Sequence, residues 1–508
     1  MSRARKVLEI VAWTLAFSLA YAQSPLYTSN QNQYFLHGLA RAGVGYLRDD
    51  WLAGTLDPTP LFSWIVQVIA ASLPSWTFYL LYGGLMGVYL FSLLGIASAV
   101  FDLRTAAKRT LVLAGLVLIH SAALRYVLAR LVLPEAEFVL EGGVAGQRLL
   151  GAVLQPSTFG IFLVVSLALY LHRRPYASVL ALGVAAAFHP TYLLSAGVLL
   201  ATFVAQTALR QRRWRESASM AILGFALLAP VAGWAYLRFR PSGADLYAVA
   251  ADILIRLRIP HHAIPVKWLD GTVGIQALIV LAAIVLARRS RLSIILVVGV
   301  VFVALTTAVQ LGSASPTLAL LFPWRLSTVL VPVSTACLLA AAVVAIVDRL
   351  AGRPQAVRTL VSVGTALVVL ASAAGMYRFL MQRQTQRADP AAPMMDFVAA
   401  TVGPGEIYLV DPKLQDFRLR TGAPIVVDAK AIPYRDEEVT AWFDRLKVAR
   451  NLFRPRLEWL DCPSVDTAHE RYGATHVVGP EEIGAACQQL EELYNDGTNA
   501  VYRIREVP

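Results

Sequence analysis

Long apolar segments separated by short polar connections make up the first 380 residues of the chain. A helix needs roughly 20 mostly apolar residues to cross a bilayer. Eleven segments meet or approach this length, and they begin near residues 7, 76, 110, 156, 176, 191, 218, 271, 292, 326 and 359. The pattern predicts an all-α polytopic membrane protein with about eleven transmembrane helices.

Two of these segments form one continuous apolar stretch, residues 176–209. The basic sequences "HRRP" and "RQRRWR" flank it, and a single crossing would put them on opposite sides of the membrane. A proline disfavours helical backbone at the residue before it. We therefore expect two crossings with a break at His189-Pro190.

Residues 386–508 follow a different pattern, in which short apolar runs alternate with helix-like stretches. The predicted strands are 406–410, 424–428, 475–479 and 500–504, and the predicted helices are 436–453 and 481–494. Such alternation is typical of an α/β domain. The sequence thus predicts a transmembrane domain at 1–385 and a small C-terminal α/β domain at 386–508.

The charge distribution indicates how the chain is oriented. Only 15% of its 508 residues are charged, and the net charge is +12, whereas soluble domains are about a quarter charged. The positive charge is concentrated in short connections at 102–109, 172–175, 210–215, 288–291 and 348–358. Basic connections of this kind are cytoplasmic and do not indicate nucleic-acid binding. We expect an inner-membrane protein with a cytoplasmic N-terminus, retained as an anchor, and an extracytoplasmic C-terminal domain.

The three cysteines add one expectation about the C-terminal domain. Cys337 lies in an apolar segment, whereas Cys462 and Cys487 lie in the C-terminal domain. Disulfides persist in oxidising compartments, so an extracytoplasmic location would allow Cys462 and Cys487 to pair.

The longest connection of the membrane half, residues 24–75, lies on the predicted outer side and contains Asp49, Asp50 and Asp57. Phe35, Leu36, Leu39, Gly43, Tyr46 and Leu47 fall on one helical face, which predicts a helix lying in the membrane interface. Residues 61–73 are apolar but short, so we expect a second, re-entrant or surface helix there.

The "DDW" at 49–51 and the "DPTPLFSWIVQVI" at 57–69 resemble the first outer loop of the GT-C superfamily of membrane glycosyltransferases. That superfamily includes protein O-mannosyltransferases, oligosaccharyltransferases and aminoarabinose transferases. The resemblance implies transfer of a sugar from a polyprenyl-phosphate donor to an acceptor on the outer face of the membrane. It also implies an acidic pair where this chain has Asn30 and Gln31, and an amide cannot take a proton from a hydroxyl.

The resemblance therefore moves the general base to Asp50, with Asp49 beside it, and makes Glu141 a second acid that orients the acceptor or binds a divalent metal. Cationic and polar groups near the outer face are candidates for binding the lipid phosphate, because a guanidinium binds phosphate in bidentate fashion. The candidate substrate-binding residues are Asn30, Gln31, His189, Arg256, Arg258, His261, His262 and Arg325.

Each of these residues also has a structural alternative. Glu141 could lie in a solvated loop, His189 could cap a broken helix, and Arg325 could form a structural ion pair. Asp50 could cap a helix or pair with Arg48. At the level of function, the alternatives to an enzyme are a non-catalytic lipid-binding GT-C relative and a transporter. The expected partners are the polyprenyl-phosphate donor and membrane lipids.

Overall fold

The computed structural model describes residues 3–132, 134–453 and 461–505. Its chain forms two compact units. The first unit comprises residues 1–23, 79–237 and 255–380, and the second comprises 24–78, 238–254 and 381–508. The first outer connection, which we expected to belong with the transmembrane domain 1–385, thus packs with the C-terminal residues.

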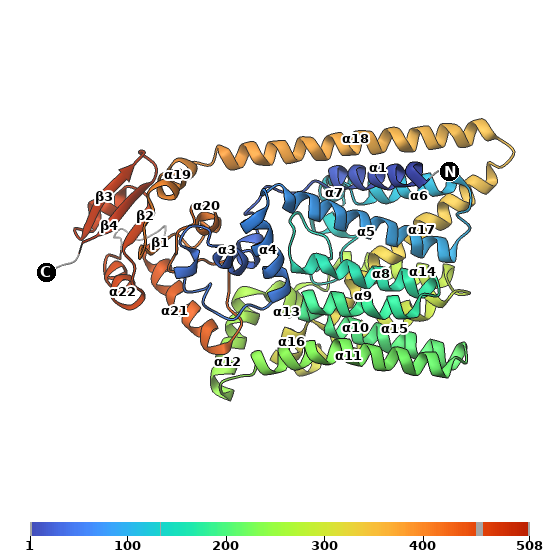
Figure 1. Cartoon of the computed structure of the whole chain (residues 1–508), viewed down its shortest axis with the longest axis horizontal. Coiled ribbons are helices and arrows are strands. Elements are labelled where there is room, and N and C mark those ends of the chain that lie inside the picture. The colour runs from blue at the N-terminus through green and yellow to red at the C-terminus, as the bar shows by residue number, and fades with distance from the viewer. Residues whose placement is uncertain (1–2, 133, 454–460, 506–508) are drawn as a thin grey trace. The chain divides into compact units, whose positions relative to one another are not determined.

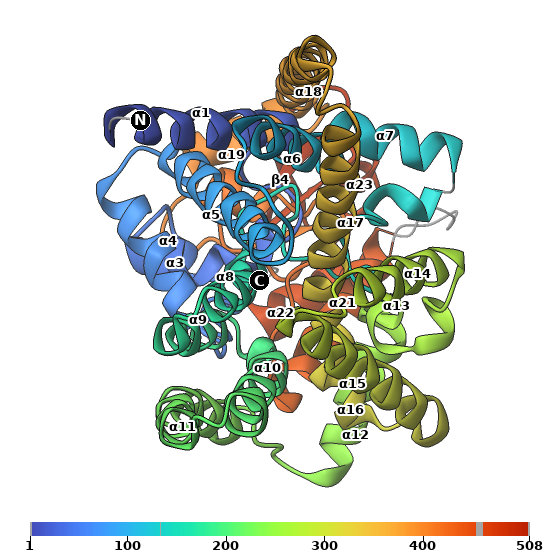
Figure 2. The same ribbon diagram turned by 90° about the vertical axis from the view of Figure 1, so that its right-hand side faces the viewer.

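The first unit is helical, and its long helices run side by side in Figure 1 and are seen end-on in Figure 2. Its α-helices are α1 (Arg3–Tyr21), α5 (Thr77–Val100), α6 (Ala106–Ile119), α7 (Ala122–Leu131), α8 (Ile161–Leu171), α9 (Pro175–Phe188), α10 (Leu193–Ala205), α11 (Trp214–Arg238), α13 (Pro260–Ala263), α14 (Gly271–Leu286), α15 (Arg291–Ser313), α16 (Pro316–Leu321), α17 (Ser327–Arg349) and most of α18 (Pro354–Arg387). Short 3-10 helices are η2 (Pro134–Phe138), η3 (Pro156–Gly160), η4 (Pro190–Tyr192), η7 (Pro265–Lys267) and η8 (Pro323–Leu326), and π-helical turns are η5 (Gln206–Arg210) and η6 (Ile253–Arg258).

The predicted apolar segments all coincide with helices, and the polytopic all-α architecture is confirmed. Among the described residues, six helices are long and apolar enough to cross a membrane, or seven if the bent pair α6–α7 is one span. The helices η3–α8, α9 and α14 are shorter, at 10–17 residues, so eleven crossings stay a prediction. The break at His189-Pro190 is confirmed, because α9 ends at Phe188 and α10 begins at Leu193.

The second unit contains a four-stranded sheet with the strand order β1-β2-β4-β3. Its strands are β1 (Tyr408–Val410), β2 (His476–Gly479), β3 (Leu490–Asn495) and β4 (Ala500–Ile504). β1 pairs in parallel with β2, while β4 is antiparallel to both β2 and β3. The small α/β domain expected near the C-terminus is therefore present.

Helices from three parts of the sequence surround this sheet or pack beside it within the second unit. They are α2 (Gln31–Tyr34), α3 (Leu36–Ala42), the 3-10 helix η1 (Leu47–Asp49), α4 (Pro60–Ser72), α12 (Ala244–Asp252), α19 (Ala392–Thr401), α20 (Phe417–Thr421), α21 (Asp436–Leu452), α22 (Pro463–Tyr472) and α23 (Glu482–Ala486). Trp442 and Leu446 of α21 are buried against strand residues such as Leu409 and Val477. The helix predicted at 436–453 is thus confirmed.

Two local predictions for this domain were wrong. Residues 481–494 do not form one helix, because α23 ends at Ala486 and β3 begins at Leu490. The backbone N–H and C=O groups of β3 bond to those of β4, a partner that a helical pattern within residues 481–494 does not reveal. Residues 424–428 form only an isolated bridge between Ile425 and Tyr408 rather than a strand.

The prediction that residues 35–47 place their apolar face in the membrane interface was also wrong. Phe35, Leu36 and Leu39 are at most 1% exposed, so this apolar face packs inside the second unit. The ring of Phe35 lies 4.8 Å from that of Phe78 and 5.8 Å from that of Phe62. The exposed apolar side chains belong to α4 instead, where Leu61, Trp64 and Val68 point away from the core.

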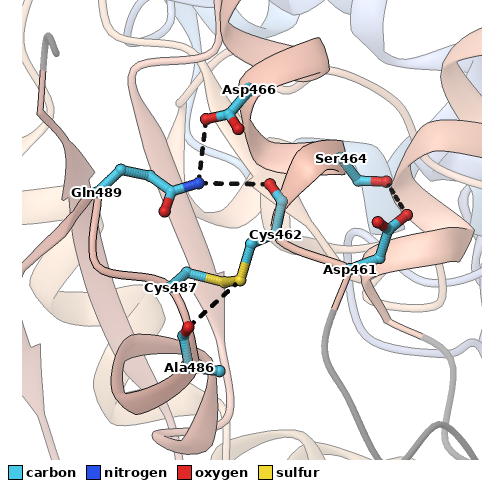
Figure 3. The surroundings of a disulfide bond; sticks show 7 residues. All are labelled: Asp461, Cys462, Ser464, Asp466, Ala486, Cys487 and Gln489. Carbon is cyan, nitrogen blue, oxygen red and sulfur yellow. Dashed lines mark hydrogen bonds between the residues drawn. A yellow bond between two sulfur atoms is a disulfide. The ribbon is translucent and has the colours of Figure 1, made fainter.

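The expected cysteine pair is confirmed as a disulfide between Cys462 and Cys487, with the Cα atoms 5.5 Å apart. It joins the residue before α22 to the residue after α23 (Figure 3). Gln489 Nε2 bridges the same two segments by donating to the Asp466 carboxylate at 3.0 Å. Cys337 is a buried free thiol in α17.

We expect the Cys462→Ser/Cys487→Ser variant to destabilise the second unit by about 3 kcal/mol, because the bond closes a loop whose ends are 25 residues apart. Hydrogen exchange of the α21 amides in the full chain measures this loss. Cys337→Ser is the matched control and should leave α21 protection unchanged. Equal protection in the double variant and the unmutated protein would contradict the expectation.

Candidate functional site

Arg325 and His189 meet in the first unit, at the start of two long helices. Arg325 lies in η8, a 3-10 helix that begins directly after Phe322. The φ of Phe322 is +48°, which is uncommon outside glycine. This turn leads the chain from α16 into α17. His189 lies between α9 and η4, where Pro190 interrupts the helix.

Among the described residues, the Arg325 guanidinium has polar partners but no acidic one. Its Nη1 donates to Thr191 Oγ1 at 2.9 Å and lies 3.3 Å from His189 Nε2. Its Nε is buried and makes no hydrogen bond, and among the described residues no carboxylate forms an ion pair with it. The structural ion pair considered for Arg325 is thus absent from the described part of the chain.

This contact assigns the tautomer of His189. Arginine can only donate, so His189 Nε2 must accept and the imidazole is neutral. Its Nδ1 then carries the hydrogen that faces Thr191 Oγ1, 3.2 Å away. His189 therefore adds no positive charge, and the charge of the group is that of Arg325.

Aromatic rings hold this group in place. The Arg325 guanidinium carbon lies 5.5 Å from the ring centroids of Tyr192 and Phe322. The adjacent Trp324 is fully buried, and its Nε1 donates to the His262 carbonyl at 3.1 Å. Such contacts fix the backbone of η8 and restrict the positions that the guanidinium can take.

The remaining cationic candidates lie in the same unit but do not all join this group. His262 Nδ1 lies 2.6 Å from the Ala145 carbonyl, and burial, followed by the nearby His261, lowers the pKa of His262 to about 3. His261 is exposed, with its ring 4.0 Å from that of His262. Arg256 is exposed and Arg258 half-buried in η6.

Glu141 forms a separate buried cluster rather than a solvated loop. It is 6% exposed and pairs with Arg125 of α7, whose Nη1 lies 3.1 Å from Glu141 Oε1. His120 Nε2 is 3.6 Å from Glu141 Oε2. The Arg125 guanidinium also lies 4.1 Å from the Tyr21 ring centroid. Glu141 thus already neutralises a buried cation.

Asp50 lies in the second unit and is engaged on both carboxylate oxygens. Oδ1 accepts from the Leu52 amide at 2.9 Å, while Oδ2 accepts from Arg418 Nε at 2.8 Å and from the Ile425 amide at 3.0 Å. The side chain is 2% exposed. A carboxylate with these partners is poorly suited to deprotonate an acceptor, so the contacts favour a structural role.

The other candidates in the first outer connection differ from Asp50. Asp49 is exposed at the end of η1. Gln31 is buried, and its Oε1 accepts from the Tyr27 amide at 2.8 Å, so it shapes the turn before α2. Asn30 is the residue before that helix, and its side chain makes no capping hydrogen bond.

The described residues contain no group of three or more His, Cys, Asp or Glu side chains placed to hold a metal ion. Glu141, the expected metal ligand, faces the Arg125 guanidinium, which disfavours a cation there.

Sequence patterns did not reveal two of the residues that organise these groups. Arg418 and Arg125 looked like ordinary members of basic helical stretches, and only contacts with distant acids distinguish them. Thr191 was visible, because it stands in the same "HPTY" as His189.

Comparisons with known proteins complete this description. A family model described as "Domain of unknown function (DUF6798)" matches residues 390–449. No curated protein sequence matches the chain. Among solved structures, the chain is similar to the crystal structure of ArnT from Cupriavidus metallidurans bound to undecaprenyl phosphate, with 14% identity and a TM-score of 0.47 over 99% of this chain and 98% of that one.

We expect Glu141→Gln to destabilise the first unit by about 3–5 kcal/mol, because it leaves the buried Arg125 without a counter-charge. The melting temperature of the purified protein in detergent should fall by roughly 5 °C or more. Glu135→Gln, at an exposed position of η2, is the control. An unchanged melting temperature for Glu141→Gln would show that the pair is not structural.

Proposed function

We propose that this protein is a membrane glycosyltransferase that moves a sugar from a polyprenyl-phosphate-linked donor to an acceptor on the outer face of the membrane. The observation that carries the proposal is Arg325, a guanidinium with no acidic partner among the described residues and with a buried Nε that makes no hydrogen bond. Arg325 is half-buried, where a charge without a counter-charge is unfavourable, and a phosphate group would supply the counter-charge.

The chemistry of the surrounding residues suits a phosphate. The guanidinium is a rigid fork of N–H donors that matches phosphate oxygens, and charge-assisted hydrogen bonds to it are strong. Thr191 Oγ1 can donate to an oxygen held by Arg325, because the two side chains are 2.9 Å apart. As the sugar–phosphate bond breaks, negative charge grows on the departing phosphate, and a preorganised cation stabilises it.

In this mechanism a carboxylate takes the proton of the acceptor hydroxyl. Asp50 and Glu141 each hold a buried arginine, so either would lose a structural ion pair by acting as the base. Asp49 is exposed and is the remaining candidate among the three acids. We therefore assign the base to Asp49 in this proposal and a structural role to the other two.

A second candidate function is a non-catalytic protein that binds a lipid-linked phosphate. It is favoured by the buried ion pairs of Asp50 and Glu141 and by the amides Asn30 and Gln31 at the position where the resemblance implies acids. Both candidates require the phosphate site, and only the enzyme requires Asp49.

We also propose that the second unit lies outside the cytoplasm of the cell. The disulfide Cys462–Cys487 supports this location, since disulfides are rare in reducing compartments. The basic connections expected on the cytoplasmic side, including 210–215, all lie outside the second unit.

The phosphate site can be tested by binding. We expect Arg325→Gln to weaken the binding of undecaprenyl phosphate to the purified protein by roughly tenfold to a hundredfold, because a hydrogen-bonded charge contributes about 1.5–3 kcal/mol. Arg325→Lys should restore only part of the affinity, since a lysine cannot bind in bidentate fashion.

The control for this experiment is Arg240→Gln, at an exposed position, which should bind as well as the unmutated protein. Equal binding by Arg325→Gln would contradict the proposal. If binding is lost but Asp49→Asn does not change the rate of sugar transfer, the non-catalytic candidate is favoured.

The proposed orientation is tested by cysteine labelling in intact cells. A membrane-impermeant maleimide should label Lys413→Cys, because Lys413 is exposed in the second unit. Arg212→Cys, in a basic connection, should react only after the membrane is permeabilised. The reverse pattern would refute the orientation.

A further inference from the structure

The dipeptide Asp50-Trp51 inserts two side chains into different parts of the same C-terminal fold. The Asp50 carboxylate pairs with Arg418 of α20 at 2.8 Å. The indole of Trp51 lies under Arg445 of α21, with the guanidinium carbon 4.2 Å from the ring centroid. Both contacts lie within the second unit.

Arg418 is the centre of the first contact. It is 1% exposed and reaches Asp50 through Nε and Asp428 through Nη1, at 2.8 Å each. Burial raises the pKa of Asp428, while Arg418 acts in the opposite direction. Arg418 thus pairs with one carboxylate from the first outer connection and one from the C-terminal residues.

The second contact involves three side chains. The Arg445 guanidinium contacts the ring of Trp51 and also that of Tyr472 in α22, whose centroid is 4.5 Å from the guanidinium carbon. Cation–π contacts of this kind are favourable over tryptophan and tyrosine. Trp51 therefore joins the first outer connection to two helices of the C-terminal domain.

Backbone amides on both sides of the dipeptide also donate hydrogen bonds to the C-terminal domain. The Tyr46 amide donates to the Gly422 carbonyl at 2.8 Å, and the Leu56 amide donates to Glu438 Oε1 at 3.1 Å. Gly45 and Gly422 touch, since a Cβ on Gly45 would lie 2.5 Å from the Gly422 oxygen. Both glycines also have positive φ, +51° and +72°, so side chains are excluded there.

We propose that Asp50 and Trp51 are an anchor that holds the first outer connection on the C-terminal domain, and that residues 390–449 provide its receptor. Arg418 and the Ile425 amide receive the Asp50 carboxylate, Asp428 pairs with Arg418 from within the receptor, and Arg445 receives the indole. The segment matched by a family model of unknown function thus has a defined partner within this chain, namely residues 45–56. This role is independent of the phosphate proposal, because it needs no substrate.

Hydrogen exchange of the full-length protein in detergent, read by mass spectrometry, tests the anchor. In Asp50→Asn, amides of residues 45–56 should exchange roughly tenfold to a hundredfold faster, since a hydrogen bond to a charged group is lost. Amides in the centre of α21 should keep their protection. Asp49→Asn, the exposed neighbour, is the matched control and should exchange as the unmutated protein does.

A double variant separates one shared interaction from two independent effects. Asp50→Asn and Arg418→Gln remove the same contact, so the double variant should exchange at residues 45–56 no faster than Arg418→Gln alone. If Arg418→Gln does not fold, Arg445→Gln replaces it, because Arg445 is half-buried and no ion pair depends on it in the described residues. Arg445→Gln should raise exchange at 45–56 and spare the centre of α21.

Three outcomes would overturn the anchor. One is unchanged exchange at residues 45–56 in Asp50→Asn. Another is equally faster exchange throughout the second unit, which would mean that Asp50 stabilises the whole fold rather than holding the connection. The third is an exchange rate at residues 45–56 of the Asp50→Asn/Arg418→Gln variant that is raised by the product of the two single-variant factors, which would mean that the two side chains act independently.

Discussion

The second unit is organised around one buried arginine. Arg418 is almost completely removed from solvent and is placed between Asp50 and Asp428. An isolated charge of this kind would be very costly, and it is tolerated because two carboxylates lie 2.8 Å from it. The carboxylates come from residues 378 positions apart (428 − 50), so this arginine joins the first outer connection to the C-terminal domain.

The first unit contains another buried arginine that is paired with a carboxylate. Arg125 is buried against Glu141, and its Nη2 donates to the Tyr21 carbonyl, so helices α1 and α7 meet at a compensated charge. Arg325 differs from both Arg125 and Arg418. It has a hydroxyl and a neutral imidazole beside it but no carboxylate in the described chain. Two of these arginines are thus neutralised from within the protein, and the third is the one for which we propose an external phosphate.

The contacts also separate two kinds of acid that look alike in sequence. Asp49 and Asp50 are neighbours, yet Asp49 is exposed whereas both carboxylate oxygens of Asp50 accept hydrogen bonds from N–H groups. Adjacent residues in a 3-10 turn point in different directions, so one of the pair can anchor the loop while the other faces solvent. A shared "DDW" motif therefore does not establish which aspartate reacts.

Local sequence patterns determined much of this protein. Apolar length located the helices, Pro190 located the break after α9, and the alternation of short apolar runs indicated the α/β character near the C-terminus. The compartment inferred from charge made the Cys462–Cys487 pair an expectation, and the structure contains it. Each of these features depends on residues close together in sequence or on composition, which a single chain displays directly.

Only the tertiary structure decided which side chains are neutralised and which faces are covered. Residues 35–47 have the periodicity of a membrane-surface helix, but their apolar side chains Phe35, Leu36 and Leu39 are buried inside the second unit. Residues 490–495 have a helix-compatible composition, but pairing with β4 makes them a strand. Asp50 stands in a motif that resembles that of a catalytic acid, but its carboxylate accepts a hydrogen bond from Arg418, 368 residues away. Periodicity indicates which face of a segment can be buried. The residues that cover that face, and those that neutralise a buried charge, can lie hundreds of positions away in the sequence.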